Sequence, residues 1–387
     1  MPKKVHVIRK KTRQRHFWIF SNEVKKVEGN PETGDVVFVY EHNHFIGSGL
    51  YNKNSLIRIR LYSDKKEPLN VNFFENRIRK AYAYRKTILP NENDFRLVYG
   101  ESDGLPGVVI DKYANTFVLQ TYSAGMDMRQ DLIVSALKNI FNPTAVFEKN
   151  DFRLRDAENL PRRESLLYGD LLAPVIISEN GVKYIVNIQA GQKTGFFYDQ
   201  RITRQKVQAM SKGKSVLDVF CYTGGFSLNA AKGGAKEVLG IDASEAALEL
   251  ARENAKLNKV HNVCKFIKGD AFIVLRELNQ EKRKFDIIVL DPPPFFKKLS
   301  EKPQGIKGYK DINLQAMKLL AEGGILVSCT CSHYLFWQDL LDVLSQAAQD
   351  TGKTFKIIDR TTQGPDHPVL LNMPESEYLR CFFLEVY

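Results

Sequence analysis

The stretch of residues 215–227 limits the possible folds of this chain more than any other part of the sequence. A short apolar run, residues 215–221, leads directly into the turn YTGG and then into a helical pattern. This order is typical of the first strand, loop and helix of a nucleotide-type α/β domain. The motifs GxGxxG and GxxxxGK[ST], whose loops hold phosphates, are both absent from this junction. Asp218, near the strand end, instead favours a cationic ligand, although a tight turn in another α/β protein gives the same pattern.

Three further apolar segments predict parallel strands that each lead to an acidic residue. They are residues 237–242, 264–269 and 285–290, followed or ended by Asp242, Asp270 and Asp291. The carboxyl ends of parallel strands are where an open α/β sheet binds its ligands. One such aspartate could simply cap the next helix. Four acidic residues beside a glycine turn favour S-adenosylmethionine, with Asp242 holding the ribose hydroxyls and Asp270 the adenine amino group.

This pattern resembles the class I S-adenosylmethionine-dependent methyltransferases, whose catalytic domain has a Rossmann-like α/β fold. The residues predicted to contact the cofactor are Asp218, Tyr222, Thr223, Gly224, Asp242, Ala243, Asp270, Ala271 and Asp291.

Length and cysteine usage limit the class of protein. A chain of 387 residues is too long for one compact core and fits two or three domains. The five cysteines all lie at or beyond position 221, which does not form a disulfide framework and suits a reducing cytosol. No apolar stretch approaches the roughly 18 residues that a membrane span needs. No secretory signal is visible at the N-terminus, so we expect a cytoplasmic protein without a membrane partner.

The N-terminal residues 1–71 show the turns and short strands of a β-rich domain. The pattern GDVV at residues 34–37 resembles the PUA modules of RNA-modifying enzymes. Residues 56–61 alternate apolar and basic side chains, so Arg58 and Arg60 would line one positive face. These features predict an RNA-binding PUA-like domain, and a small barrel with another task is the alternative.

Positive charge is concentrated at the N-terminus of a chain whose net charge is +11. The basic residues that precede the first acidic residue are Lys3, Lys4, Arg9, Lys10, Lys11, Arg13 and Arg15. Phe17 and Trp18 follow them directly. Basic side chains neutralise phosphates and aromatic rings stack on bases, so this arm is a candidate RNA contact. The alternative is a solvated arm beside aromatic residues of the core.

The rest of the chain divides into a predicted central α+β domain, residues 72–185, and a catalytic domain, residues 186–387. The segment GQKTGFFYDQR at residues 191–201 is dense in polar, aromatic and charged side chains. We expect it to line the cofactor pocket or contact RNA, and we assign Arg201 to the substrate. A capped helix start is the alternative.

The motif DPPPF at residues 291–295 indicates how a base is held. In amino- and base-methyltransferases, an acidic or amide residue before prolines holds a planar nitrogenous base, and the prolines stiffen the loop. Residues of and after this motif are assigned to the substrate: Asp291, Pro292, Pro293, Phe295 and Lys310. Lys310 belongs to a lysine-rich stretch that suits a phosphate backbone, and solvated loop charge is the alternative.

The sequence CTCS at residues 329–332 closes a predicted strand, residues 324–332. Cytosine carbon 5 is a poor nucleophile, but attack of a thiolate on carbon 6 makes it enamine-like. The triplet TCS resembles the signature of RNA cytosine-5 methyltransferases, so Cys331 is the predicted nucleophile and Cys329 a packed residue. A buried inert pair is one alternative. A metal site with His333 is another, but the spacing is not that of zinc sites, and no metal is expected.

The motifs GQKTGFFYDQR, DVFCYTGGFS, DPPPF, GYKDIN, TCS and DHP together resemble the RlmI-like family of 23S ribosomal RNA cytosine-5 methyltransferases. The resemblance covers nearly the whole chain. It implies a PUA domain, S-adenosylmethionine as cofactor, 23S ribosomal RNA as partner and 5-methylcytidine as product. The target cytosine should be unpaired or flipped out.

One departure and several alternatives accompany this resemblance. Many other RNA cytosine-5 enzymes carry Asp-Ala-Pro-Cys where this chain has Asp-Pro-Pro, so the base that assists the reaction is unassigned. A related group methylates guanine N7 on a similar catalytic domain. A non-catalytic, RNA-binding ribosome assembly factor is the alternative from another class. The oligomeric state, a homodimer included, is open.

Overall fold

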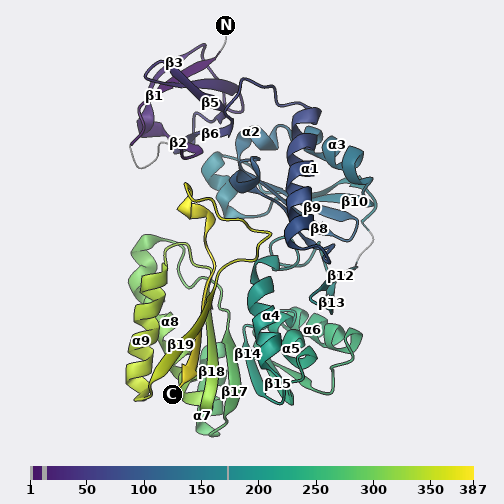
Figure 1. Cartoon of the computed structure of the whole chain (residues 1–387), viewed down its shortest axis with the longest axis vertical. Coiled ribbons are helices and arrows are strands. Elements are labelled where there is room, and N and C mark those ends of the chain that lie inside the picture. The colour runs from purple at the N-terminus through teal and green to yellow at the C-terminus, as the bar shows by residue number, and fades with distance from the viewer. Residues whose placement is uncertain (1–2, 11–14, 172–173) are drawn as a thin grey trace. The chain divides into compact units, whose positions relative to one another are not determined.

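The computed structural model describes residues 3–10, 15–171 and 174–387. The chain forms two compact units (Figure 1). The first unit comprises Met1–Ile177, Val186–Tyr198 and Pro365–Ser376, and the second comprises Ser178–Ile185, Asp199–Gly364 and Glu377–Tyr387. Each unit therefore contains residues that are far apart in the sequence. The boundaries of the three predicted domains, 1–71, 72–185 and 186–387, stay predictions.

The first unit begins with a six-stranded sheet. Its strands are β1 (Lys4–Val7), β2 (Trp18–Phe20), β3 (Val24–Glu28), β4 (Val36–Glu41), β5 (His44–Tyr51) and β6 (Ile57–Ser63), in the order β2-β6-β5-β4-β1-β3. Alternate residues of β1 and β4 point into a small core that includes Val5, Val7, Val37 and Val39. The predicted β-rich domain is therefore confirmed. Of the basic arm, Lys11 and Arg13 lie outside the described residues.

A second, five-stranded sheet belongs to the same unit. Its strands are β7 (Phe95–Tyr99), β8 (Val108–Tyr113), β9 (Thr116–Thr121), β10 (Ala145–Lys149) and β11 (Glu164–Gly169), in the order β11-β10-β9-β8-β7. The helices of this part are α1 (Val71–Ile88), α2 (Ala124–Asp127) and α3 (Gln130–Phe141). Apolar residues of α1 and α3 share one buried core with the strands, so this part is a compact α+β structure.

The C-terminal segment Pro365–Ser376 completes the first unit. Arg85 donates a hydrogen bond of 2.8 Å to the carbonyl oxygen of Asp366. The backbone N–H of Arg96 donates one of 3.0 Å to the Asp366 carboxylate. Arg85 of α1 and Arg96 of β7 thus have hydrogen-bond acceptors in a segment more than 250 residues later in the chain.

The chain passes toward the second unit through a two-stranded hairpin, β12 (Val175–Glu179) and β13 (Val182–Val186). The second unit contains a seven-stranded sheet. Its strands are β14 (Ser215–Val219), β15 (Glu237–Asp242), β16 (Cys264–Lys268), β17 (Phe285–Leu290), β18 (Leu320–Thr330), β19 (Phe355–Thr361) and β20 (Arg380–Val386). They lie in the order β16-β15-β14-β17-β18-β20-β19. Strands β14 to β18 are parallel and β20 is antiparallel to β18.

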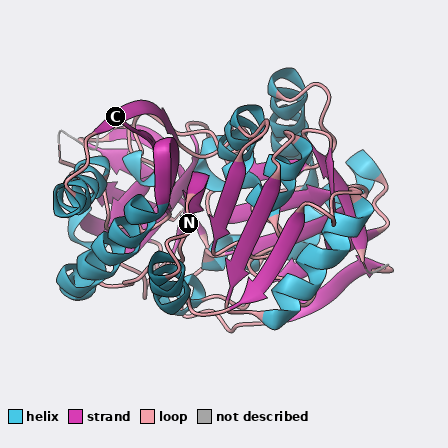
Figure 2. Cartoon of the chain, turned by 90° about the horizontal axis from the view of Figure 1, so that it is seen from below, coloured by secondary structure: helices cyan, strands magenta, loops and turns pink. Residues whose placement is uncertain are grey.

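Helices connect these strands in the way an α/β chain requires (Figure 2). They are α4 (Arg201–Met210), α5 (Gly225–Lys232), α6 (Glu245–Leu257), α7 (Ala271–Gln280), α8 (Lys302–Leu319) and α9 (Trp337–Thr351). The strand order reverses at β14, whose neighbours are β15 and β17. In open α/β sheets the crevice outside the carboxyl ends of the strands at such a reversal is the ligand site.

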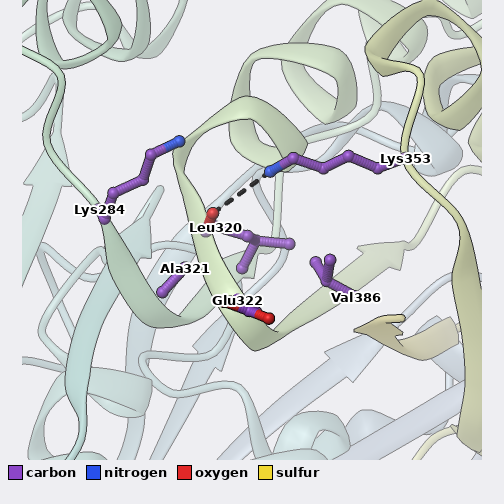
Figure 3. A pocket seen from close by; sticks show the side chains of 6 residues that line it. All are labelled: Lys284, Leu320, Ala321, Glu322, Lys353 and Val386. Carbon is purple, nitrogen blue, oxygen red and sulfur yellow. Dashed lines mark hydrogen bonds between the residues drawn. The ribbon is translucent and has the colours of Figure 1, made fainter.

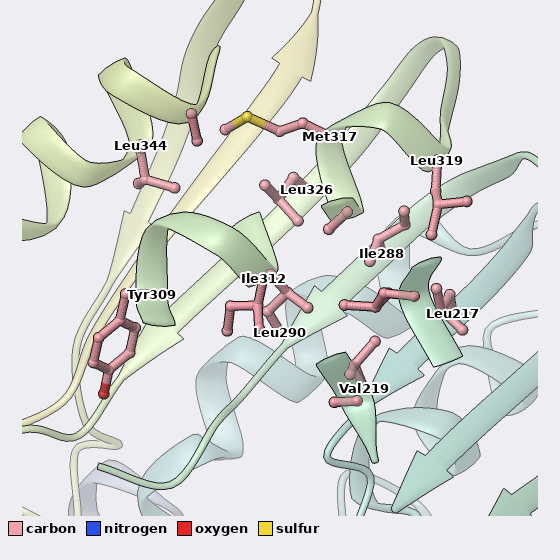
Figure 4. Close-up of a cluster of buried hydrophobic side chains, with 14 of the residues drawn as sticks. Leu217, Val219, Ile288, Leu290, Tyr309, Ile312, Met317, Leu319, Leu326 and Leu344 are labelled. Atoms are coloured by element: carbon pink, nitrogen blue, oxygen red, sulfur yellow. The ribbon is translucent and has the colours of Figure 1, made fainter. Parts of the chain in front are cut away.

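One face of the large sheet is buried under α8 and α9 (Figure 4). The labelled side chains are Leu217, Val219, Ile288, Leu290, Tyr309, Ile312, Met317, Leu319, Leu326 and Leu344, all of which are buried. Strands covered on both faces become continuous apolar runs, which is why residues 287–290 of β17 are all apolar and buried. This core holds the carboxyl ends of β14, β17 and β18 in fixed positions.

Strand β18 differs from its predicted bounds. It runs from Leu320 to Thr330 rather than over residues 324–332. Cys331 therefore follows the strand instead of belonging to it. Among the described helices, none is both long and apolar enough to span a membrane.

Candidate cofactor and catalytic site

Asp218 lies inside strand β14 and is fully buried. Its Oδ2 accepts hydrogen bonds from the backbone N–H of Ser227 (2.8 Å) and from the Ser227 hydroxyl (2.6 Å). Its Oδ1 is buried with no hydrogen-bond partner. Burial raises the pKa of Asp218 to about 6, although the Ser227 hydrogen bonds oppose the change. A buried polar atom without a partner is costly, so Oδ1 is an acceptor available to a ligand group.

The loop between β14 and α5 has an unusual backbone. Phe220 and Tyr222 have φ angles of 66° and 48°, in the left-handed region that non-glycine residues rarely adopt. Gly224 has a φ of 84°, and a Cβ there would meet Ala251 and Phe266 at 3.4 Å. Non-glycine residues in this region cost of the order of 1–3 kcal/mol each, and such residues cluster at ligand-binding sites. Packing around the loop therefore holds its backbone in a conformation that the isolated chain would avoid.

The carboxylate of Asp242, at the end of β15, fixes the same loop. Its Oδ2 accepts a hydrogen bond of 2.8 Å from the backbone N–H of Tyr222, and its Oδ1 accepts one of 2.9 Å from that of Ser244. Asn254 of α6 donates a hydrogen bond of 3.2 Å to the carbonyl oxygen of Thr223. The predicted cofactor residues of β14, β15 and the intervening loop are thus in direct contact with one another.

The third predicted acid, Asp270, is exposed and caps helix α7. Its Oδ1 accepts a hydrogen bond of 2.8 Å from the backbone N–H of Phe272. Ala243 is exposed and Ala271 is buried at the start of α7. Capping is the ordinary role of such an aspartate, so the contact of Asp270 with adenine stays a prediction.

These residues fit S-adenosylmethionine by their chemistry. The ligand carries a cationic sulfonium and ammonium, two ribose hydroxyls and an adenine. The carboxyl edge of the seven-stranded sheet offers carboxylates, and the backbone at Gly224 lies close to the ring of Phe266. Asp218 has a buried acceptor oxygen to spare, and each oxygen of Asp242 has lone pairs beyond the bonds it accepts.

Asp291 follows β17 and is held by a residue from the start of the second unit. The side-chain amide of Gln200 donates a hydrogen bond of 2.9 Å to Asp291 Oδ1. The carbonyl oxygen of that amide accepts a contact of 3.7 Å from the Cys381 thiol. Gln200 is buried, so both ends of its side chain are fixed. Sequence patterns placed Gln200 in a dense polar segment without revealing this pairing, because its partner is 91 residues away.

Cys331 lies in the loop after β18 and is partly exposed, whereas Cys329 within the strand is fully buried. Burial raises the pKa of the Cys329 thiol well above its usual range. A thiol that stays protonated is a poor nucleophile. The two cysteines therefore differ in burial, and the role of Cys331 as the nucleophile stays a prediction.

Tyr309 of α8 connects the Cys331 loop with the DPPPF loop. The Thr330 hydroxyl donates a hydrogen bond of 3.0 Å to the Tyr309 hydroxyl, and the backbone N–H of Ser332 donates one of 3.2 Å to Thr330. The ring of Tyr309 lies 4.6 Å from that of Phe295. The residues on both sides of Cys331 are therefore tied to the loop that begins with Asp291, and sequence reasoning did not identify Tyr309.

Other predicted substrate residues have partners within the second unit. Pro292 is buried and Pro293 exposed. Lys310 forms an ion pair of 2.8 Å with Asp350 of α9. Arg201 is almost fully buried, with its Nε 3.5 Å from the Glu179 carboxylate. Their assignment to the substrate stays a prediction.

The arginine face predicted for β6 is wrong for Arg60, whereas Arg58 is partly exposed and donates a hydrogen bond of 3.0 Å to the carbonyl oxygen of Asn52. Arg60 is only 6% exposed and lies between two carboxylates, at 3.1 Å from Glu101 and 3.3 Å from Glu158. Trp18, expected near RNA bases, donates its indole N–H to Glu101 at 2.6 Å. Phe17 packs against the core of the six-stranded sheet. Arg60 and Trp18 thus bind carboxylates of the part of the first unit that follows the six-stranded sheet, and the buried Arg60 is not available to RNA.

A hollow of about 440 Å³ lies elsewhere in the second unit (Figure 3). It is lined by Lys284, Leu320, Ala321, Glu322, Lys353 and Val386. Leu320 begins β18, so the hollow lies at the end of the sheet opposite to the carboxyl ends of the parallel strands. Lys353 donates hydrogen bonds to the carbonyl oxygens of Met317 and Leu320 and so caps helix α8. No cluster of metal-ligating side chains occurs among residues 3–10, 15–171 and 174–387.

Comparison with known proteins places the chain in a family. The S-adenosylmethionine-dependent methyltransferase family matches residues 159–373, and a PUA-like domain matches residues 8–64. A "Ribosomal RNA large subunit methyltransferase I" of Aeromonas salmonicida is 40% identical over 373 residues, covering 95% of this chain and 94% of that protein. The protein of the same name from Vibrio vulnificus is 40% identical over 380 residues, covering 96% of each chain.

Solved structures agree on the fold. A Streptococcus mutans chain assigned to the S-adenosylmethionine-dependent methyltransferases matches with a TM-score of 0.84 at 24% identity, covering 100% of each chain. Its sequence similarity supports the fold alone. The matched domains, the curated relatives and the cofactor loop together show that this chain belongs to the ribosomal RNA large subunit methyltransferase I family of S-adenosylmethionine-dependent methyltransferases, with a PUA-like domain at its N-terminus.

Proposed function

We propose that this protein methylates carbon 5 of a cytosine in large-subunit ribosomal RNA, with Cys331 as the nucleophile. The observation that carries the proposal is the pair of loops after β17 and β18. A partly exposed cysteine follows β18, and Tyr309 ties the residues around it to the loop that begins with Asp291. The names of relatives about 40% identical over 95% of the chain supply the class of RNA.

Cysteine is needed because carbon 5 of cytosine does not react directly. The Cys331 thiolate adds to carbon 6, which breaks the aromaticity of the ring and leaves carbon 5 enamine-like. S-adenosylmethionine, when bound, would supply an electrophilic methyl group: carbon 5 would take the methyl as the methyl–sulfonium bond breaks, leaving S-adenosylhomocysteine. A base takes the carbon 5 proton, the electrons of that bond restore the double bond, and the thiolate leaves carbon 6. Nitrogen methylation would use the ring's own lone pair and need no thiol.

Asp291 positions the base in this proposal. Gln200 donates to Oδ1 and fixes the carboxylate, and a carboxylate accepts several hydrogen bonds, so Asp291 is proposed to accept one from the exocyclic amino group of cytosine. Pro292 and Pro293 restrict the loop. The ring of Phe295 is only partly buried and offers an apolar contact. A base stacked in a duplex cannot reach these groups, so the target must be unpaired or flipped out.

The test is transfer of labelled methyl to unmodified large-subunit ribosomal RNA, followed by nucleoside mass spectrometry. We expect 5-methylcytidine from the wild type and none from Cys331→Ala, a loss on the order of 10³-fold or more. Cys329→Ala is the matched control, because the fully buried Cys329 cannot reach a substrate, and it should keep the product.

A mechanism-based probe separates covalent catalysis from positioning. RNA that carries 5-fluorocytidine should form a complex with the wild type that survives denaturation, because the fluorine at carbon 5 cannot leave as a proton does. Cys331→Ala should form none. A methylguanosine product that is insensitive to Cys331→Ala would overturn the mechanism and favour guanine N7. Failure to bind S-adenosylmethionine in calorimetry would favour a non-catalytic assembly factor.

A further inference from the structure

The outward face of strand β4 carries large aromatic rings, beside Lys4 and His6 of β1. In both strands alternate residues are buried, with Val5 and Val39 at 0% exposure. A sheet that is solvated on one face normally carries polar residues at the intervening positions. Here the intervening positions of β4 carry Phe38 and Tyr40, and β1 carries His6. Large rings on an outward face call for an explanation in terms of a partner.

The rings contact one another across neighbouring strands. His6 stacks on Tyr40 with ring centroids 5.7 Å apart and planes inclined by 25°. Phe45 of β5 lies 6.2 Å from Phe38 and 5.8 Å from Tyr40, edge to face in both cases. We call His6, Phe38, Tyr40 and Phe45 the aromatic face. All four side chains are partly exposed.

Two lysines border the aromatic face. The Lys66 ammonium lies 5.6 Å, 5.8 Å and 5.2 Å from the ring centroids of Phe38, Tyr40 and Phe45. The Lys4 ammonium lies 5.9 Å from that of Tyr40. In the described part of the chain, neither lysine forms an ion pair with a carboxylate. Their charge is therefore available to an anionic partner.

Two carboxylates of the neighbouring strands are paired with basic side chains. Glu28 of β3 pairs with Lys26 at 2.7 Å and lies 3.5 Å from His6. Glu41, at the end of β4, pairs with Arg9 at 2.9 Å. The aromatic face thus combines exposed rings with an excess of positive charge.

We propose that the aromatic face is a platform for a single-stranded segment of RNA. Bases would stack on Tyr40 and Phe45, and Lys4 and Lys66 would contact the phosphates beside them. Rings that accept bases, with cations spaced around them, are the two components of sequence-tolerant single-strand binding. The proposal rests on the proposed function for the nature of the partner, and it assigns that contact to a face other than the one expected for Arg58 and Arg60.

The experiment measures binding of a fluorescent, short, single-stranded RNA to the full chain without cofactor, at fixed salt. Tyr40→Leu and Phe45→Leu keep apolar volume while removing the ring. Each should weaken binding by about fivefold or more, because a base stacked on an aromatic ring contributes roughly that much. Lys66→Gln should lower the slope of log affinity against log salt by about 0.7 for the loss of one phosphate contact.

Tyr387→Leu is the matched control. Tyr387 is 79% exposed and has the Lys356 ammonium 4.0 Å from its ring centroid, but it lies in the second unit. Its change should leave RNA affinity unaltered. Unfolding midpoints of all variants must match the wild type, so that lost binding is not lost folding.

Wild-type affinity in both leucine variants would overturn the platform. So would unchanged RNA affinity together with lost binding to protein-containing ribosomal particles, because that result identifies a protein partner. The measured RNA affinity does not depend on which methylated nucleoside the protein produces. A methylguanosine product together with weakened RNA binding would refute the catalytic proposal alone, and 5-methylcytidine with unchanged binding would refute the platform alone.

Discussion

The positions of side chains at the carboxyl edge of the seven-stranded sheet can be predicted from the sequence better than those in the N-terminal six-stranded sheet. At the edge, Asp218 and Asp242 meet around one loop, as expected from their places in the sequence. In the N-terminal sheet, Arg60 and Trp18, expected to face RNA, both donate hydrogen bonds to Glu101, and Arg60 is buried.

The difference follows from topology. In an open parallel sheet every strand ends at the same edge, so residues that follow strands come together whatever packs on the faces. In the six-stranded sheet, either face of a strand can be covered by another part of the unit. Which face stays exposed depends on partners far away in the sequence, and the alternation of residues does not reveal it.

The largest effect is expected from replacing Arg60, which tests whether this side chain stabilises the fold or binds RNA. Arg60→Met leaves Glu101 and Glu158 buried without their cation, which should lower the free energy of unfolding by about 3–5 kcal/mol. Urea unfolding measures the loss. Arg162→Met is the matched control, because the Arg162–Asp156 pair is exposed and its removal should leave the unfolding midpoint unchanged. If Arg60 acts mainly on RNA, the folded Arg60→Met protein will instead lose RNA affinity at normal stability.

The pH dependence of the free energy of unfolding tests whether Asp218 is buried at the carboxyl edge of the seven-stranded sheet. Burial raises the pKa of Asp218 to about 6 from its ordinary 3.8. The folded state thus holds this proton more tightly than the unfolded chain, so the free energy of unfolding should fall as pH rises from about 4 to about 6, by roughly 3 kcal/mol. Asp218→Asn should remove that slope in denaturant titrations across this range.

Asp286→Asn is the control for this slope. Although burial acts to raise it, hydrogen bonds from Ser215 hold the pKa of Asp286 below its ordinary value. Its stabilisation is present above the unfolded pKa of about 4 and is lost at lower pH. The change at Asp286 should therefore leave the slope between about pH 4 and 6 intact. An unaltered slope in Asp218→Asn would mean that the raised pKa is not a property of the folded protein.

A smaller effect is expected at Gly224. Gly224→Ala places a Cβ at a φ of 84° and at 3.4 Å from Ala251, which costs about 1–2 kcal/mol of the loop conformation. Affinity for S-adenosylmethionine in calorimetry should fall about tenfold. Gly234→Ala has a similar φ of 87° but meets atoms only at 3.7 Å and beyond. Equal loss of cofactor affinity in both variants would show that general strain, not the cofactor loop, is responsible.

The parts of the site that the sequence revealed are local in the chain. Strand, turn and acidic residue lie within a few positions, so Asp218, Gly224 and Asp242 could be assigned together. The contacts of Gln200 with Asp291 and of Tyr309 with Thr330 join segments that are 91 and 21 residues apart. No periodicity encodes such pairs, because they depend on how loops from different strands are packed.

The Asp366 segment has a consequence for biosynthesis. Arg85 and Asp366 are 281 residues apart in sequence but belong to one compact unit. As the chain leaves the ribosome, the first 177 residues emerge long before Pro365–Ser376 exists. The first unit therefore acquires this segment only after the strands of the second unit up to β19 have been made, and β20 of the second unit follows it. A nascent or truncated chain that stops before this segment leaves the Arg85 guanidinium and the Arg96 amide without these acceptors, so the first unit forms these contacts only after Pro365–Ser376 has been translated.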